Sequence, residues 1–398
     1  MKIFRNLSEA VVDSLQLIFE EGRYADKVIE KVLKQNPKWG ARDRRFIAET
    51  TYDIVRWHRL FYNLANIDEH DYWGLLGAWC IWNKIDPPGW EEFENLNKSM
   101  FFENYDRAQH VLKIRESIPD WLDETGLKAL GAAWEKEIHA LNQPAKVVLR
   151  VNTLKISRQD LQRQLKEQEG IETTAPADYP DALILEERQN IFTRPQFRDG
   201  LFEVQDAGSQ RIAAFLQPSS GMRVIDACAG GGGKTLHLAA LMKNKGRIIA
   251  LDTEAWKLDE LKKRARRAGA SNIIETRAID SSKVIKRLEN SADRLLLDVP
   301  CSGLGVLRRN PDAKWKLSPE FIEKVIVQQQ DILTQYTSML RSGGLLVYST
   351  CSILPEENEK QVERFLESSG GKFELLEQTT LLPSAGYDGF FMARMKKV

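Results

Sequence analysis

The sequence predicts a multidomain chain whose C-terminal half is an α/β domain with a parallel, doubly wound sheet. After residue 201, short aliphatic runs alternate with amphipathic helical segments, and a glycine-rich loop at 230–233 follows the first run. Alternation of buried strands and helices is typical of βαβ units with right-handed crossovers. The uninterrupted aliphatic run at 295–297 is typical of a strand that is buried on both faces.

The first 200 residues predict two further domains. Residues 1–118 carry apolar residues three to four positions apart, which indicates an all-helical domain. Residues 119–200 contain short alternating runs around a polar helix at 158–168, which indicates a small α+β unit. The α/β domain then occupies 201–398. The tryptophans between residues 57 and 90 have helical spacing, so we interpret them as core residues.

Composition limits the classes of protein that remain. The 398 residues include 57 basic and 57 acidic side chains, so any contact with nucleic acid must come from local patches. The four cysteines have no metal-type spacing, and we expect reduced thiols and no bound metal. With no apolar stretch long enough to span a bilayer and no secretory pattern, we expect a cytoplasmic protein without membrane association, and a monomer.

Two cysteines each follow a predicted strand. Cys301 comes after the aliphatic run 295–297, and Cys351 comes after the run 345–347. In open α/β sheets, ligands bind at the carboxyl ends of the strands. We therefore expect both thiols at one ligand-binding edge, together with Asp298, which lies three residues before Cys301.

The glycine loop predicts a cofactor site. Because a strand leads into the loop and a helix follows, backbone amides face one ligand. Asp252 ends the next strand, where a carboxylate accepts both ribose hydroxyls, and Asp280 follows the third, where it can accept from an adenine amino group. An adenosine without phosphates fits S-adenosylmethionine. The predicted cofactor-binding residues are Cys228, Ala229, Gly230, Gly231, Gly232, Gly233, Lys234, Asp252, Asp280 and Asp298.

The end of the same loop has a second interpretation. Gly233, Lys234 and Thr235 match the end of a nucleoside-triphosphate P-loop, and Asp298 could serve as its magnesium ligand. That pattern needs a glycine five residues before Gly233, where this chain has Cys228. The missing glycine disfavours the P-loop interpretation.

Several strings together resemble the RNA 5-methylcytosine methyltransferases of the RsmB and NSUN type, and most of all the bacterial RsmB-like members. They lie in the family's order at 149–155, 202–210, 228–235, 298–312, 348–352, 355–359 and 388–392. The segment 41–57 resembles the NusB-like domain of the same family. The resemblance implies a NusB-like helical domain, an RNA-recognition-like α+β subdomain and a class I Rossmann-like methyltransferase domain. The family usually has Ala-Pro where this chain has Gly230 and Gly231.

The resemblance also implies methyl transfer from S-adenosylmethionine to carbon 5 of a cytosine in structured RNA. Carbon 5 becomes nucleophilic when a thiolate adds to carbon 6, and a second group then acts as acid or base to resolve the adduct. The residues alone do not rank the two thiols, but the resemblance assigns the attack to Cys351 and adduct release to Cys301. We expect Asp298 to hydrogen-bond the base and Lys234 to lower a thiol pKa.

Basic residues suggest where RNA binds. Arg308, Arg309, Lys314 and Lys316 follow Cys301 directly, and we expect them to contact RNA beside the site. A second basic run at 262–267 lies on a predicted helix and is equally typical of a solvated face.

Three alternatives to ribosomal RNA methylation remain open. Transfer RNA is a second possible substrate. A DNA cytosine-5 methyltransferase would carry a large target-recognition insertion, which this sequence lacks, and would leave Cys351 unexplained. A non-catalytic ribosome-assembly factor would work through its NusB-like domain, but here Cys301, Cys351, Asp298 and Lys234 are all present.

Overall fold

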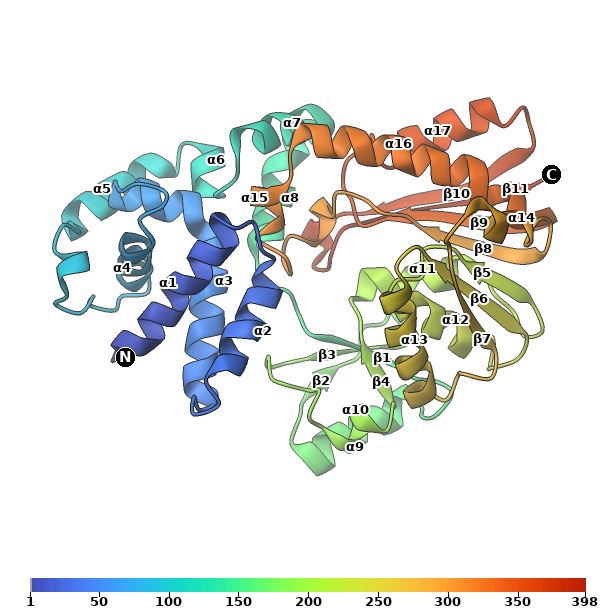
Figure 1. Cartoon of the computed structure of the whole chain (residues 1–398), viewed down its shortest axis with the longest axis horizontal. Helices are drawn as coiled ribbons and strands as arrows, with labels where there is room; N and C mark the ends of the chain where they lie inside the picture. The colour runs from blue at the N-terminus through green and yellow to red at the C-terminus, as the bar shows by residue number, and fades with distance from the viewer. Residues whose placement is uncertain (1) are drawn as a thin grey trace. The chain divides into compact units, whose positions relative to one another are not determined.

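A computed structural model describes residues 2–398 of the protein (Figure 1). The chain folds into two compact units. The first unit contains the chain up to Pro144 together with Leu307–Pro319. The second contains Ala145–Val306 and Glu320–Val398. The first unit thus runs past the boundary expected at residue 118 and takes in a short segment from within the predicted α/β domain.

The first unit is helical, as the spacing of its apolar residues predicts. Its helices are α1 (Arg5–Phe19), α2 (Ala25–Gln35), α3 (Ala41–Ala65), α4 (Tyr72–Trp82), α5 (Lys98–Ala108), α6 (Leu112–Arg115), α7 (Asp120–Leu130), α8 (Trp134–Asn142) and α15 (Ala313–Lys316), with 3-10 turns η1 (Glu91–Phe93) and η2 (Gly131–Ala133). Helix α4 is apolar around its whole circumference and packs against α1 and α3 in the core. The Asp71 side chain begins α4 by accepting from the Gly74 amide at 2.8 Å.

The second unit contains a seven-stranded sheet in the order β10-β11-β9-β8-β5-β6-β7. The strands are β5 (Arg223–Asp226), β6 (Arg247–Asp252), β7 (Ile274–Ala278), β8 (Ala292–Asp298), β9 (Leu340–Thr350), β10 (Phe373–Leu381) and β11 (Phe390–Lys397). The five strands β5 to β9 are parallel, whereas β10 and β11 pair antiparallel with each other and β11 with β9. The prediction of a wholly parallel sheet is therefore wrong. Only eight residues connect β10 to β11, too few for a crossover between parallel strands.

Helices cover both faces of this sheet (Figure 1). On one face lie α11 (Ala207–Phe215), α12 (Gly233–Leu241) and α13 (Ala255–Ala268); on the other lie α14 (Ser282–Lys286), α16 (Pro319–Tyr336) and α17 (Glu359–Ser368). Successive residues of a strand point to opposite faces of the sheet. In β8, Leu296 packs with the core under α11, α12 and α13, and Leu295 and Leu297 pack with the core under α14, α16 and α17.

The chain order creates a switch point beside β5. From β5 the chain proceeds to β6 and β7 on one side, and β8 and β9 then lie on the other. Ligands bind at such points, outside the carboxyl ends of the strands. The glycine loop after β5 and the Asp298–Cys301 segment after β8 are therefore adjacent by topology.

A smaller antiparallel sheet precedes the large one in the second unit. Its strands β1 (Val148–Val151), β2 (Thr173–Thr174), β3 (Ala182–Leu185) and β4 (Phe202–Val204) have the order β2-β3-β1-β4, and the helices are α9 (Arg158–Glu169) and α10 (Pro195–Arg198). Leu161 and Leu165 of α9 are buried with Leu149 of β1. Strand β4 lies beyond residue 200, and α7 and α8, at the start of the range predicted for the α+β unit, belong to the first unit.

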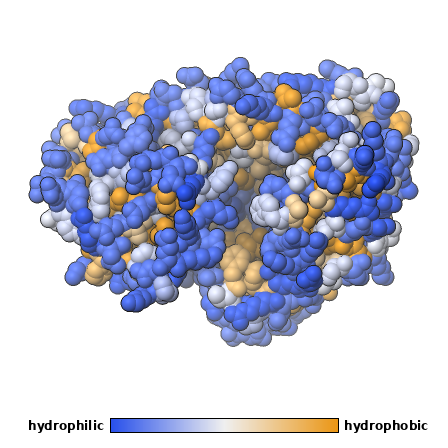
Figure 2. Space-filling view, viewed as in Figure 1, coloured by the Kyte–Doolittle hydropathy of each residue, from blue (hydrophilic) through white to orange (hydrophobic). Residues whose placement is uncertain are grey.

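Among residues 2–398, no helix combines the length and the apolar character needed to cross a membrane. Figure 2 shows that hydrophilic side chains cover most of each unit on the face in view, with the hydrophobic ones in scattered groups.

Candidate active site

The glycine loop between β5 and α12 makes a tight turn that depends on two glycines. Gly230 has a φ of 53° and Gly232 a φ of 83°, both in the left-handed region. A Cβ on Gly232 would lie 2.4 Å from Cγ of Leu261 in α13. The loop therefore packs directly on α13, and its backbone faces the end of the sheet.

We expect the substitution Gly232→Ala to lower the free energy of unfolding by about 2–4 kcal/mol, because a left-handed φ and an overpacked Cβ both oppose alanine. The midpoint of urea unfolding measures the effect. Gly231→Ala is the matched control, because Gly231 has no left-handed φ and its Cβ would meet only the flexible end of Arg264, at 3.3 Å. Equal midpoints for the two variants would contradict the packing argument.

Asp252, at the end of β6, holds this loop. Its Oδ2 accepts from the Gly230 amide at 2.8 Å, and its Oδ1 accepts from the Glu254 amide at 2.9 Å. A pocket of about 590 Å³ opens here between the loop and α16. Its lining residues include Cys228, Gly230, Asp252, Asp298, Lys257 and Tyr336.

The structure does not bring the predicted Asp280 into this pocket. Asp280 is exposed and accepts from the Ser281 hydroxyl at 3.0 Å, whereas the preceding residue, Ile279, lines the pocket. The sequence predicted an acid in the pocket wall just after β7. The residue that lines the wall is instead Ile279, one position before Asp280.

Lys234 and Asp298 form an ion pair at the switch point. Lys234 Nζ lies 2.5 Å from Asp298 Oδ2, and Ser349 donates to Asp298 Oδ1 at 3.0 Å. Burial disfavours the charge of Lys234, but the neighbouring Asp298 outweighs burial and raises the pKa of Lys234 above its ordinary value. The site thus keeps a permanent cation beside a carboxylate. Cys351 also lies close enough to Lys234 to favour its charged form.

The two cysteines that follow β8 and β9 are in contact. Cys301 Sγ and Cys351 Sγ are 3.1 Å apart, and the Cys351 amide lies 3.3 Å from Cys301 Sγ. Both side chains are free thiols and partly exposed. The contact with Cys351 and burial raise the pKa of Cys301 well above its ordinary value. The two sulfurs are therefore within hydrogen-bond distance, and either thiol can donate to the other.

The other two cysteines are inert. Burial raises the pKa of Cys80, in α4, to about 12, as expected for a packing residue. Cys228 lies within the glycine loop, where burial raises its pKa well above the ordinary value. Only Cys301 and Cys351 pair with each other at the sheet edge.

Sequence reasoning missed two buried acids beside the site. Asp226 ends β5, and burial raises its pKa to about 7; its Oδ2 accepts from Thr235 at 2.7 Å. Glu357 lies beneath the two cysteine loops and is fully buried. The segment 355–359 stood out only as a matching string, so the resemblance marked Glu357 without indicating what it contacts.

The basic residues predicted to contact RNA have partners within the protein, and two of the four are buried. Arg308 is buried and donates to the Ala140 carbonyl at 2.7 Å, and Lys314 is 1% exposed. Lys316 donates to the Arg23 carbonyl at 2.6 Å and pairs with Asp312 at 2.5 Å. Arg309 is half-buried and has partners of its own. Burial therefore argues against RNA contact by Arg308 and Lys314, whereas for the partly exposed Arg309 and Lys316 RNA contact stays a prediction.

The second basic run is also engaged within the protein. Arg264 and Arg267 pair with the buried Glu203 at 2.9 and 2.6 Å. Lys262 and Lys263 pair with acids three residues earlier on the same helix. This run is a partly solvated helix face, as one of its two interpretations predicted.

Lys314 supports the fold of the first unit through its side-chain nitrogen. It donates to the Arg56 carbonyl at 2.8 Å and to Asn142 Oδ1 at 3.2 Å, and burial lowers its pKa well below the ordinary value. We expect Lys314→Ala to cost about 2–5 kcal/mol of stability, because it leaves a void and two buried acceptors without a donor. The urea midpoint is the measurement, and the exposed Lys136→Ala is the control. An unchanged midpoint for Lys314→Ala would argue against this role.

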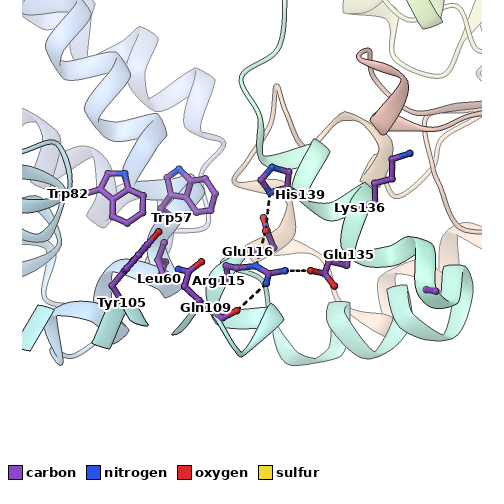
Figure 3. Close-up of a pocket in the computed structure, with 11 residues that line it drawn as sticks. Trp57, Leu60, Trp82, Tyr105, Gln109, Arg115, Glu116, Glu135, Lys136 and His139 are labelled. Atoms are coloured by element: carbon purple, nitrogen blue, oxygen red, sulfur yellow. Dashed lines mark hydrogen bonds and ion pairs between the residues drawn. The ribbon is translucent and has the colours of Figure 1, made fainter. Parts of the chain in front are cut away.

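A second large pocket, of about 650 Å³, lies within the first unit (Figure 3). Trp57, Trp82 and Tyr105 form one side, and Arg115, Glu116, Glu135 and His139 line the other. None of the predicted site residues lines it. The tryptophans are thus not uniformly core residues as predicted: Trp79 is buried, whereas Trp57 and Trp82 border this pocket.

Within residues 2–398, no group of three or more histidine, cysteine or acidic side chains is arranged to hold a metal ion.

Comparison with known proteins supports a methyltransferase. A model of the 16S rRNA methyltransferase RsmB/F family matches residues 213–396, and a model of the ferredoxin-like domain of RsmF/B-like methyltransferases matches residues 118–192. The crystal structure of PH0851 covers 100% of both chains with a TM-score of 0.83 and 26% identity. The fold is therefore that of a Rossmann-like methyltransferase with an added ferredoxin-like domain.

Curated relatives extend the match to nearly the whole chain. The probable ribosomal RNA small subunit methyltransferase B of Synechocystis sp. is 32% identical over 432 residues, which cover 94% of this chain and 95% of that protein. The ribosomal RNA small subunit methyltransferase B of Pasteurella multocida is 37% identical over 294 residues, or 70% of this chain and 65% of that protein. The chain belongs to the RsmB/F family of methyltransferases.

Proposed function

We propose that this protein transfers a methyl group from S-adenosylmethionine to carbon 5 of a cytosine in small-subunit ribosomal RNA, through a covalent adduct with Cys351. The observation that carries the proposal is the pair of thiols 3.1 Å apart at the sheet edge, beside the Lys234–Asp298 ion pair. One thiol can attack the base, and the second can act as the acid or base that resolves the adduct. The names of the curated relatives favour ribosomal over transfer RNA.

The residues at the end of β5 and β6 suit S-adenosylmethionine. The Asp252 carboxylate lines the pocket, where it can accept from ribose hydroxyls, and the loop amides around Gly230 border the same space. A Cβ on Gly230 would project into open space, so the loop leaves room for a ligand close to its backbone. Tyr336 and Lys257 complete the wall. When bound, the cofactor supplies an electrophilic methyl group.

Cys351 begins the reaction by adding to carbon 6 of the cytosine. The new bond is C6–S, and the electrons of the C5=C6 double bond make carbon 5 the nucleophile that takes the methyl group. Cys301 Sγ lies 3.1 Å from Cys351 Sγ, so the Cys301 thiol can donate to the Cys351 thiolate before attack. The Lys234 ammonium adds a second favourable interaction with the thiolate.

Release reverses the addition. The Cys301 proton passes to the departing Cys351 sulfur, and the Cys301 thiolate takes the proton from carbon 5 as the C6–S bond breaks and the double bond forms again. Asp298 accepts from the cytosine amino group or its protonated ring nitrogen, which stabilises charge that develops on the ring. Ser349 and Lys234 hold that carboxylate in place.

The experiment is methyl transfer from labelled S-adenosylmethionine to naked small-subunit ribosomal RNA, with transfer RNA in parallel. We expect label in 5-methylcytosine of the ribosomal RNA, identified by nucleoside mass spectrometry and located by bisulfite sequencing. Label in another nucleoside would refute the cytosine assignment. Label confined to transfer RNA would refute the substrate.

A further inference from the structure

Glu357 lies between the two cysteine loops and binds both of them. Its Oε2 accepts from the Ser302 amide at 2.7 Å, and its Oε1 accepts from the Ser302 hydroxyl at 2.5 Å. The Ser352 hydroxyl also donates to Oε1, and Gln329 in α16 donates to Oε2 at 3.1 Å. Ser302 and Ser352 directly follow Cys301 and Cys351, so one carboxylate contacts the next residue after each thiol.

These four hydrogen bonds join segments that are far apart in the sequence. The two loops leave different strands, β8 and β9, and the thiols are fifty residues apart in sequence. Glu357 is 0% exposed, and Ser302 and Ser352 are 6% and 0% exposed. Hydrogen bonds to a charged group are stronger and shorter than neutral ones, and water does not compete at a buried site.

The next residue, Asn358, secures only one of the loops. Its Oδ1 accepts from Thr350, and its Nδ2 donates to the Ser352 carbonyl at 3.0 Å. It therefore fixes the backbone on both sides of Cys351 without reaching Cys301. Glu357 alone of this pair connects the two loops.

We propose that Glu357 is a positioning residue that holds the Cys301 and Cys351 loops together and so keeps the two thiols in contact. The inference rests on the proposed function for its effect on catalysis, but the contact itself can be tested without methyl transfer. The charge of Glu357 acts in the same direction, because after the Cys351 contact and burial it is a further cause that raises the pKa of Cys301.

Three substitutions separate position from charge. Glu357→Gln keeps the shape: its amide oxygen can accept from the Ser302 amide and Gln329, while its amide group donates to the two serine hydroxyls, which rotate to accept. Glu357→Asp keeps the charge but is one methylene too short to bind both loops. Glu357→Ala removes all four hydrogen bonds of the carboxylate. Glu356→Gln is the control, because the Glu356 side chain pairs with Lys360 at the surface.

The first readout is the rate at which diamide, a thiol oxidant, converts Cys301 and Cys351 into a disulfide, followed by peptide mass spectrometry. We expect the wild type, Glu356→Gln and Glu357→Gln to react at similar rates, and Glu357→Asp and Glu357→Ala to react about tenfold more slowly, because displacement by about 1 Å costs up to about 100-fold in rate. Equal rates in folded Glu357→Asp and wild type would overturn the proposal, as would a loss in Glu357→Gln equal to that in Glu357→Asp.

The second readout is methyl transfer. We expect kcat to fall about 100-fold in Glu357→Asp with KM for S-adenosylmethionine unchanged, and to stay within about tenfold of the wild type in Glu357→Gln. A rise in KM with kcat unchanged would overturn the positioning role. If the wild type transfers no methyl group, the proposed function fails, and the disulfide rates alone decide the role of Glu357.

Discussion

The Cys351→Ala variant is expected to lose methyl transfer by about 10⁴-fold or more, because the proposed mechanism assigns the bond to carbon 6 to this thiol. The backbone amide of residue 351, which lies 3.3 Å from Cys301 Sγ, is unaffected by the substitution, so the loop should keep its place. Single-turnover transfer of labelled methyl groups to small-subunit RNA measures the loss. Calorimetric binding of S-adenosylmethionine shows that the fold and the cofactor site survive.

The control for that variant is Cys80→Ala. Cys80 is a buried thiol of the first unit and takes no part in the site, so its removal should leave the rate of transfer unchanged. Turnover that persists in Cys351→Ala and disappears in Cys301→Ala would reverse the assignment of the two thiols.

The Cys301→Ala variant is expected to accumulate a covalent protein–RNA complex while its turnover falls about 100- to 10,000-fold. The attacking thiol remains, but the group that gives its proton to the departing sulfur is gone. The complex should migrate more slowly than the free protein in a denaturing gel and should disappear on ribonuclease treatment. A Cys301→Ala variant that turns over at the wild-type rate without any complex would show that release does not need this thiol.

Local pattern was enough to predict the edge on which the site lies. The aliphatic runs before Cys301 and Cys351 are β8 and β9, and these strands are neighbours, so the thiols that follow them meet. The glycines after β5 likewise form a turn with left-handed φ angles. Each of these features depends on a few consecutive residues and on the rule that parallel strands end at one edge.

The position of the basic segment after Cys301 in the folded protein could not be predicted from local pattern. A lysine on a short helix is usually solvated, and nothing near Lys314 in the sequence shows otherwise. Its acceptors are the carbonyl of Arg56 and the side chain of Asn142, which are 258 and 172 residues away. Burial of such a residue depends on packing between distant segments, which periodicity does not describe.

For Glu357 and Asp280, too, the local sequence did not show where the side chain lies. An acid directly after a predicted strand is a reasonable cofactor ligand, but Asp280 is exposed, and the preceding residue, Ile279, lines the pocket. Glu357 stood out only as part of a matching string that gave no contacts, yet it joins the two thiol loops. Side-chain direction and shared acceptors are set by tertiary structure.

Incubation of S-adenosylmethionine and small-subunit RNA with Cys301→Ala, and in parallel with the double variant Cys301→Ala/Cys351→Ala, tests the covalent mechanism itself. The measurement is the mass of the protein–RNA complex after ribonuclease digestion and denaturation. We expect a methylated cytidine nucleotide attached to the peptide that contains Cys351 in the single variant, and no complex in the double variant. A complex of equal yield in both variants, or attachment to another residue, would contradict attack by Cys351.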